Sequence, residues 1–135
     1  MKVRDVMSTR LHTLRPDATL GDAVGVMGKH RIRHVPVVED GRVIGMISDR
    51  DVKMALGPDA ATMSLDEIDP RQADGEISWF MTETVLTVQA DASLADAAEI
   101  LVEHRFGALP VLEGQRLVGV LSVVDVLKAA LPRLR

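Results

Sequence analysis

The chain has no cysteine and no tyrosine, and its aromatic side chains are limited to one tryptophan and two phenylalanines. The lack of cysteine excludes disulfide bonds, thiolate metal sites and a cysteine nucleophile. With so few aromatic residues, we expect a core built from Val, Leu, Ile, Met and Ala. The apolar content of 47% and charged content of 27% are ordinary for a soluble globular protein and argue against a disordered chain.

Long apolar runs and an excess of basic charge are also missing. The longest apolar stretches, such as Val43 to Ile47, have the length of a strand and fall far below the ~18 residues of a membrane span. The first five residues include three charged ones, Lys2, Arg4 and Asp5, and lack the apolar segment of a signal peptide. The formal net charge of −4 offers no clustered basic surface for nucleic acid. We therefore expect a cytoplasmic protein with no membrane and no nucleic-acid partner.

An internal repeat organises the sequence. Residues 7–55 align without a gap to the residues 74 positions later, and 18 of these 49 positions are identical. We therefore divide the chain into a first domain at 1–56, an acidic linker at 57–76 and a second domain at 77–135. The linker carries six acidic residues against the single Arg71. We expect it to be solvated, with one helical turn near Ser64 to Ile68.

Both repeats carry the same local signals. A hydroxyl residue three positions before an aspartate, as in Thr19–Asp22 and Ser93–Asp96, is typical of a helix-capping box. Apolar residues at i, i+3, i+4 and i+7 predict the following helix, and two apolar runs around a Gly-containing turn predict a hairpin. A short strand, at residues 12–14 or 86–88, is expected before the first helix, and a second helix after the hairpin. The predicted fold is α/β, with two tandem β-α-β-β-α modules packed through their sheets with pseudo-twofold symmetry.

Ordered motifs occur in each repeat. The first contains VRDVMS at 3–8, HVPVV at 34–38 and GMISDRD at 45–51, and the second contains WFMT at 79–82, ALPVL at 108–112 and GVLSVVD at 119–125. In this order they resemble the CBS-domain family over essentially the whole chain, with the nearest likeness to stand-alone pairs of the acetoin-utilisation regulatory type. The resemblance implies a Bateman module, whose clefts commonly bind AMP, ADP, ATP, S-adenosylmethionine or NAD-like ligands, and which often forms homodimers.

The Gly-x-x-Ser-x-x-Asp string is the sharpest candidate site. It places Ser48 and Asp51, and again Ser122 and Asp125, at the start of the last helix of each repeat. Free N–H groups and the helix dipole favour phosphate there. The resemblance implies that the two aspartates hold the ribose, and the serines would contact ribose or phosphate. The same spacing also suits a capping box, worth about 1 kcal/mol without any ligand, so both interpretations stay open.

Basic residues distinguish the two repeats. Arg33, His34 and Arg50 lie near the first motif, which begins at Gly45, and the second repeat has no charge at the aligned positions. Arginine donates bidentate hydrogen bonds to phosphate, and histidine can add charge near neutral pH. Solvated surface charges would give the same pattern, and that alternative also stays open. We expect one good nucleotide site and one weaker site. The adenine would lie against apolar side chains and backbone groups at Val35, Leu109, Thr13 and Thr87.

No set of residues in the sequence supports catalysis or a metal site. Ser48 and Ser122 have no paired base, and no spacing resembles a zinc site. Trp79 and Phe80 depart from the aligned residues of the first repeat and suggest a core plug or a dimer contact.

The leading hypothesis is a regulatory module, not an enzyme, that senses an adenine nucleotide or S-adenosylmethionine and needs no other cofactor. It would modulate an unidentified protein or its own assembly as a homodimer. The alternative is a structural dimerisation module with degenerate ligand sites.

Overall fold

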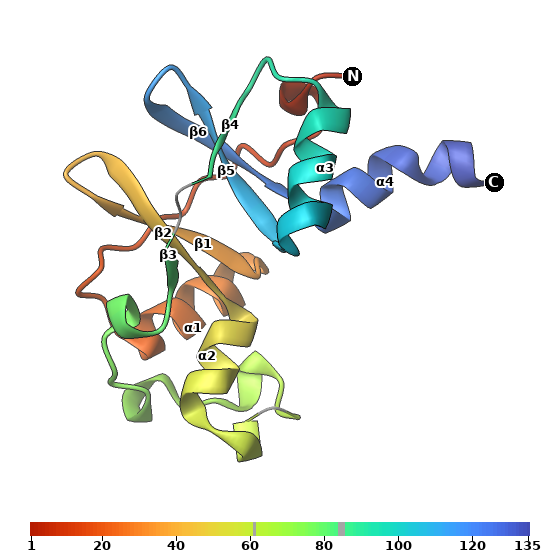
Figure 1. The fold of residues 1–135 in the computed structure, drawn as a ribbon. Coiled ribbons are helices and arrows are strands. Elements are labelled where there is room, and N and C mark those ends of the chain that lie inside the picture. Colours follow the sequence, from red (N-terminus) through yellow and green to blue (C-terminus); the bar gives the residue numbers. More distant parts are fainter. Residues whose placement is uncertain (61, 84–85) are drawn as a thin grey trace. The chain divides into compact units, whose positions relative to one another are not determined.

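The computed structural model describes residues 1–60, 62–83 and 86–135, which form two compact units (Figure 1). The first-repeat unit comprises residues 12–85, and the second-repeat unit comprises residues 1–11 together with 86–135. In the described part of the chain, each unit holds one three-stranded sheet and two α-helices. The predicted α/β class and the repeated module are therefore confirmed.

The first-repeat unit is built on an antiparallel sheet of order β1-β2-β3. Its elements are α1 (Leu20–His30), β1 (His34–Glu39), β2 (Arg42–Ser48), α2 (Asp49–Leu56) and β3 (Thr82–Glu83). Where the first short strand is predicted, Leu14 forms a parallel bridge with Val37 of β1. Between α2 and β3 the described residues, 57–60 and 62–81, form four 3-10 helices: η2 (Pro58–Ala60), η3 (Leu65–Glu67), η4 (Pro70–Gln72) and η5 (Ile77–Trp79).

The second-repeat unit has a sheet of order β4-β5-β6, with β4 parallel to β5 and β5 antiparallel to β6. Its elements are η1 (Val3–Asp5), β4 (Val88–Gln89), α3 (Leu94–His104), β5 (Ala108–Glu113), β6 (Arg116–Ser122) and α4 (Val123–Leu134). On the far side of β6, Ser8 forms an antiparallel bridge with Val120. The second repeat thus realises the predicted β-α-β-β-α order in full.

Local sequence signals explain where these elements begin and turn. The Thr19 hydroxyl accepts a hydrogen bond from the Asp22 N–H at 3.0 Å, and the Asp22 carboxylate accepts one from the Thr19 N–H at 2.9 Å. This reciprocal pair starts α1 as predicted. In the β1–β2 hairpin both turn residues, Asp40 and Gly41, have positive φ, which is the conformation that an Asp-Gly pair favours.

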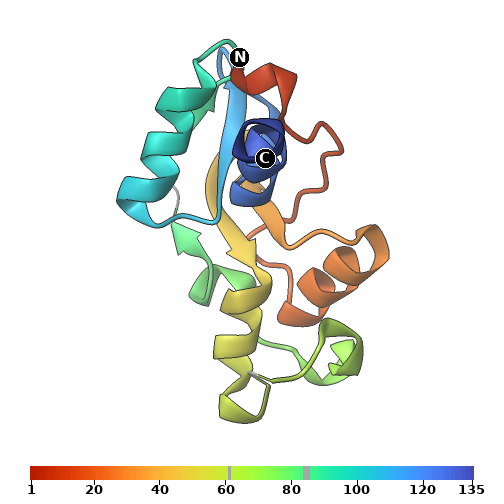
Figure 2. The same ribbon diagram turned by 90° about the vertical axis from the view of Figure 1, so that its right-hand side faces the viewer.

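The N-terminal segment of each repeat packs in the unit of the other repeat. Val3 is fully buried in the second-repeat unit, and its N–H donates to the Ala92 carbonyl at 2.9 Å. Figures 1 and 2 show this red segment beside the start of α3. Ile77, the residue aligned with Val3, is fully buried in the first-repeat unit and donates to the Ala18 carbonyl at 2.8 Å. The predicted division at 1–56, 57–76 and 77–135 follows the sequence repeats and stays a prediction. The compact units have other boundaries, because each includes the N-terminal segment of the other repeat.

The expectation of a solvated linker is wrong for its apolar positions. Ile68 and Ala73 belong to the core of the first-repeat unit. The Gly21 N–H donates to the Ala73 carbonyl at 2.6 Å, and a Cβ at Gly21 would collide with the Pro70 carbonyl oxygen. The linker therefore covers the start of α1, and its acidic side chains face outward because only the apolar ones gain from burial. The predicted helical turn near Ser64 is confirmed as η3.

The aromatic pair at the end of η5 is not a core plug. The Trp79 side chain is 80% exposed and Phe80 is 38% exposed. A Cβ at Gly75 would lie 3.0 Å from the Phe80 ring, so this ring packs close to the chain at Gly75, whereas Trp79 projects from the first-repeat unit. Across the three described ranges of the chain, no helix has both the length and the apolar content to cross a membrane.

Candidate functional site

The junction between β2 and α2 contains the predicted Ser-x-x-Asp site. The Ser48 hydroxyl accepts a hydrogen bond from the Asp51 N–H at 3.0 Å, and Asp51 Oδ2 accepts one from the Ser48 N–H at 2.9 Å. Ser48 has an extended backbone, as an N-cap residue requires. The capping interpretation is thus realised in the structure. Ligand binding at Asp51 remains a prediction.

Capping leaves part of Asp51 available. The residue is half-buried, and within the described ranges no hydrogen bond reaches its second oxygen, Oδ1. Each carboxylate oxygen can accept two hydrogen bonds. The cap and a pair of ligand hydroxyl groups are therefore chemically compatible on the same side chain.

Basic side chains gather at this junction through the β1–β2 pairing. His34 lies opposite Ser48 in the strand register, and the Asp49 N–H donates to the Arg33 carbonyl at 3.0 Å. This bond holds the start of β1 against the start of α2. Arg33 and Arg50 are exposed, and His34 is half-buried. The structure thus brings the predicted basic residues to one corner, beside the N-terminus of α2.

The second-repeat unit repeats the geometry without the charges. The Ser122 hydroxyl accepts from the Asp125 N–H at 3.1 Å, and Asp125 Oδ2 accepts from the Ser122 N–H at 2.9 Å. The Val123 N–H donates to the Gly107 carbonyl at 3.0 Å, as Asp49 does to Arg33. Ala108 stands opposite Ser122, in the place of His34. The two junctions share a scaffold and differ in electrostatics.

The residues predicted to hold adenine occupy equivalent places in the two units. Val35 and Leu109 are 0% and 1% exposed and belong to the two hydrophobic cores, so any ligand contact at these positions would involve their main chains. Thr13 is exposed and precedes the bridge from Leu14 to β1, while Thr87 is half-buried and precedes β4. Both threonines therefore lie at the outer edge of their own sheet.

Gly45, the first residue of the motif, has a packing role. It is buried in β2, opposite Glu83 of β3. A Cβ there would lie 2.7 Å from Met81 Sδ and 2.9 Å from the Thr82 carbonyl oxygen. Gly119 has the same relation to Met7 and Ser8. The glycine thus lets the segment from the other repeat approach the sheet.

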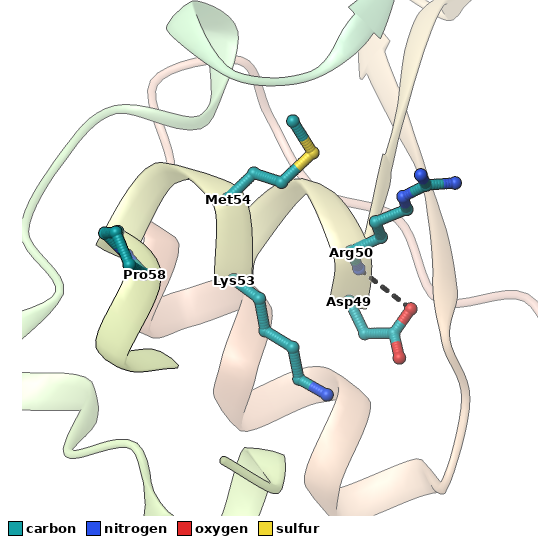
Figure 3. A pocket seen from close by; sticks show the side chains of 6 residues that line it. Asp49, Arg50, Lys53, Met54 and Pro58 are labelled. Atoms are coloured by element: carbon teal, nitrogen blue, oxygen red, sulfur yellow. Dashed lines mark hydrogen bonds between the residues drawn. The ribbon is translucent and has the colours of Figure 1, made fainter. Parts of the chain in front are cut away.

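A surface hollow of about 570 Å³ lies along the outer side of α2 (Figure 3). Its lining residues are Asp49, Arg50, Lys53, Met54, Gly57 and Pro58. Figure 3 shows the Arg50 and Met54 side chains on one side of the helix, with Lys53 directed away from them. The Arg50 N–H donates to Asp49 Oδ1 at 2.9 Å. Among the predicted site residues, only Arg50 lines this hollow. The i, i+3 spacing of Arg50 and Lys53 is the sequence signal that could have indicated it.

Sequence reasoning also missed a histidine pair. The rings of His12 and His30 stack with their centroids 3.5 Å apart and their planes inclined by 15°. Nothing in the spacing of the two residues indicated this contact, because it joins the chain before α1 to the end of that helix. Parallel stacked rings direct their nitrogen lone pairs in parallel planes, so the pair does not form a chelate.

Known proteins of similar sequence and structure agree with this description. The CBS domain family matches residues 3–58 and 75–132. The CBS domain-containing protein YhcV of Bacillus subtilis is 29% identical over 126 residues, which are 91% of this chain and 81% of that protein.

Two solved structures extend the likeness. The putative acetoin utilization protein AcuB of Vibrio cholerae is 30% identical with a TM-score of 0.79, over 99% of this chain and 94% of its own. CBSX2, solved in complex with AMP, is 30% identical with a TM-score of 0.75, over 99% of this chain and 98% of its own. Because the family match covers both repeats, as the resemblance predicts, this chain belongs to the CBS-domain family as a CBS pair.

Proposed function

We propose that this CBS pair is a regulatory module, not an enzyme, that binds an adenine nucleotide in the cytoplasm and thereby modulates a partner protein or its own assembly as a homodimer. The observation that carries the proposal is the likeness to CBSX2, which binds AMP and aligns with almost the whole chain at 30% identity. The ligand would act by binding two states of the module with different affinity.

The first junction suits a phosphorylated nucleoside best. In our proposal the unoccupied Oδ1 of Asp51 accepts hydrogen bonds from the ribose hydroxyls, while Ser48 caps the helix. Arg33 and Arg50 are exposed residues at the same corner, and in the proposal their guanidinium groups donate to the phosphate, with His34 opposite Ser48. Main-chain groups near Thr13 would contact the base.

The second junction would form a weaker site. Ser122 and Asp125 provide the same cap and a carboxylate, but Gly107, Ala108 and Val124 stand at the positions of Arg33, His34 and Arg50. The missing basic side chains would weaken the binding of a nucleotide more than that of a nucleoside or S-adenosylmethionine, because these two ligands carry no phosphate. In this proposal Thr87 and Leu109 contribute main-chain groups to that site.

Thermal denaturation with AMP, ADP, ATP, adenosine and S-adenosylmethionine tests the proposal. A ligand that binds only the native state at a hundredfold excess over Kd stabilises it by about 2.7 kcal/mol, which is a clear shift of the melting temperature. We expect AMP to shift the transition more than adenosine. If no ligand shifts the melting temperature and calorimetry also detects no binding, the proposal that the protein is a nucleotide sensor is refuted.

A matched pair of variants separates binding from capping. Asp51→Ala and Asp22→Ala each remove the acid of a capping box, so each should cost about 1 kcal/mol of stability. Only Asp51→Ala should also abolish the AMP shift, since Asp22 lies at the start of α1, away from the predicted site. Arg33→Ala should reduce the AMP shift towards that of adenosine. A full AMP shift in Asp51→Ala would mean that this residue acts as a cap alone.

One observation favours the alternative of a structural dimerisation module. Helix α4 exposes apolar side chains along its length, including Leu127 at 53% and Leu134 at 69%. If no adenine ligand binds and the chain is nevertheless a dimer in solution, this second function replaces the first.

A further inference from the structure

Trp79 has the highest exposed fraction among the large apolar side chains of the described ranges, at 80%. It is the last residue of η5, and the next residue, Phe80, is 38% exposed. The chain has only three aromatic residues, so two of the three stand next to each other at the surface of the first-repeat unit. Aromatic side chains, tryptophan above all, are enriched where proteins contact other molecules.

The fold does not require an aromatic side chain at this position. In the second repeat the aligned residue is Asp5, and its Oδ2 accepts a hydrogen bond from the Lys2 N–H at 2.8 Å at the start of η1. An indole ring cannot accept that bond, because its only polar group is an N–H donor. Trp79 therefore stabilises its own turn less than an aspartate would, which points to a role outside the unit.

The chain next to Trp79 is strongly acidic. Residues 15–22 and 66–83 lie together, since the Ile77 N–H donates to the Ala18 carbonyl at 2.8 Å and both η3 and η4 pack against α1. Figure 1 shows this green segment beside α1. The two ranges contain eight acidic and two basic residues, a formal charge of −6, whereas the whole chain has −4. The acidic excess of the protein is thus confined to this part, and the remainder is slightly positive.

Both basic residues of these ranges are already in ion pairs. Arg15 Nε lies 3.3 Å from Asp17 Oδ1, and Arg71 Nη2 lies 3.1 Å from Asp69 Oδ2. Each arginine is therefore engaged by an aspartate within two positions of it. The other carboxylates of the two ranges are left to face solvent or a partner.

The carboxylates nearest to Trp79 along the chain can bind a cation. We define the Trp79 surface by these carboxylates and the aromatic pair, all of them exposed: Asp74, Glu76, Trp79, Phe80 and Glu83. In the part of the chain that the structure describes, no basic side chain pairs with its acids, and Glu76 accepts one hydrogen bond, from the Ser78 hydroxyl at 2.9 Å. The face of an indole ring attracts a cation, and a carboxylate accepts two parallel hydrogen bonds from a guanidinium group. An arginine side chain can satisfy both at once.

The charge of the Trp79 surface selects the class of partner. A negative surface repels nucleic acid and anionic membrane lipids. A second copy of this chain offers only the small positive excess that remains outside the acidic ranges. A basic segment of another protein is complementary in charge, and its apolar side chains can pack on Phe80.

We propose that the Trp79 surface binds a basic, arginine-containing segment of a partner protein, with an arginine stacked on Trp79 and hydrogen-bonded to a neighbouring carboxylate. The inference rests on the regulation of a partner in the proposed function and is independent of adenine-nucleotide binding. It assigns the partner contact to the first-repeat unit.

Fluorescence anisotropy of a labelled peptide tests this contact. The probe is an amidated hexapeptide of alternating arginine and leucine, and the comparison peptide has glutamate in place of arginine. We expect the arginine peptide to bind with a Kd of about 100 µM or lower at about 50 mM salt, and more weakly at high salt. Trp79→Asp should raise that Kd about fivefold or more. The variant carries one more negative charge, so attraction between charges alone would lower the Kd instead.

Matched variants locate the contact and check the fold. Glu76→Gln should raise the Kd about twofold or more, whereas Glu103→Gln, at an exposed residue of α3, should leave it unchanged. Trp79→Asp should melt no lower than the wild type, since the new carboxylate can accept a hydrogen bond from the Glu76 N–H, as in the second repeat. In the wild type, the emission of Trp79, the only tryptophan, should change as the peptide saturates the protein.

Four results would each overturn the proposal: no binding of the arginine peptide at about 1 mM, equal binding of the glutamate peptide, an unchanged or lower Kd for Trp79→Asp, or equal effects of the two glutamate substitutions. A change of Trp79 emission with protein concentration in the absence of peptide would assign the surface to a second copy and refute the proposal as well. The AMP-induced shift of the melting temperature is measured on Trp79→Asp in parallel. We expect it to be unchanged, so that failure of peptide binding and failure of nucleotide binding are distinguished.

Discussion

Replacing Gly45 by alanine tests whether the first residue of the Gly-x-x-Ser-x-x-Asp motif is needed for packing or for a ligand. In the structure, the added methyl group would lie 2.7 Å from Met81 Sδ and 2.9 Å from the Thr82 carbonyl oxygen. The methionine side chain can rotate away. The carbonyl belongs to β3, which is held by pairing with β2, so it can move only if that pairing is disturbed.

The expected loss of stability is set mainly by the contact with the Thr82 carbonyl oxygen, because the methionine side chain can move and the carbonyl cannot. Inserting a methyl group into a packed site costs about 1–3 kcal/mol, and a clash with backbone favours the upper half of that range. For a unit of this size, each kcal/mol lowers the melting temperature by about 4–8 °C. We therefore expect Gly45→Ala to lower the transition of the first-repeat unit by on the order of 10 °C. Met81→Ala added to Gly45→Ala should recover none of the loss, because the clash with the Thr82 carbonyl oxygen remains and Met81 itself packs against the core.

Differential scanning calorimetry with and without AMP is the appropriate assay. Gly25→Ala serves as the control, since Gly25 is exposed in α1 and a Cβ there has no neighbour within 4 Å. It should stabilise the unit by up to about 1 kcal/mol through helix propensity. A Gly45→Ala protein that melts like the wild type but no longer responds to AMP would refute the packing argument and assign Gly45 to the ligand.

Two further predictions concern the exchanged segment and the exposed aromatic residue. Val3→Ala should destabilise the second-repeat unit by about 1–3 kcal/mol, because a fully buried side chain loses its contacts. In hydrogen exchange, the Leu94 N–H, which donates to Met1, should lose protection, while the Leu20 N–H, which donates to Gly75, should keep it. Equal loss at both amides would contradict the division into units. Trp79, the only tryptophan, is 80% exposed, so its fluorescence maximum should shift little when the chain unfolds. A strongly blue-shifted native spectrum would mean that Trp79 is covered, as in a dimer contact.

Signals that act over a few residues could be predicted from the sequence. The capping boxes at Thr19 and Ser48 and the Asp40-Gly41 turn appear as expected. Each depends on side chains and backbone groups within four positions, so the local sequence determines the geometry. For Ser93, the hydroxyl accepts from the Asp96 N–H as predicted, and the Ser93 backbone bridges to Lys2. That bridge needs a segment more than ninety positions away, which no local pattern can reveal.

Long-range packing is where prediction from sequence failed. Ile68 and Ala73 sit among acidic residues, and the high local charge indicated a solvated linker, yet both pack into the core. The composition of the segment counts apolar and acidic residues together, whereas the fold buries the apolar ones and leaves the acidic ones at the surface. For the candidate site, the hairpin pattern of the sequence accounts for the pairing of His34 with Ser48 in the strand register. It could not predict that Val35 and Leu109 are wholly buried, because the pattern of a short apolar strand does not show whether one face or both are covered.

The exchange of N-terminal segments has a consequence for how the protein is made. The first-repeat unit is continuous from residue 12 to residue 85, so all of its parts leave the ribosome before the second-repeat unit is complete. Residues 1–11 are synthesised before the first-repeat unit, yet their partners, such as Ala92, come after it. Val3 and Met7 must remain unpaired in the meantime, and closing so long a loop is slow. Folding of these two units is therefore expected to end with the docking of residues 1–11 onto the second-repeat unit.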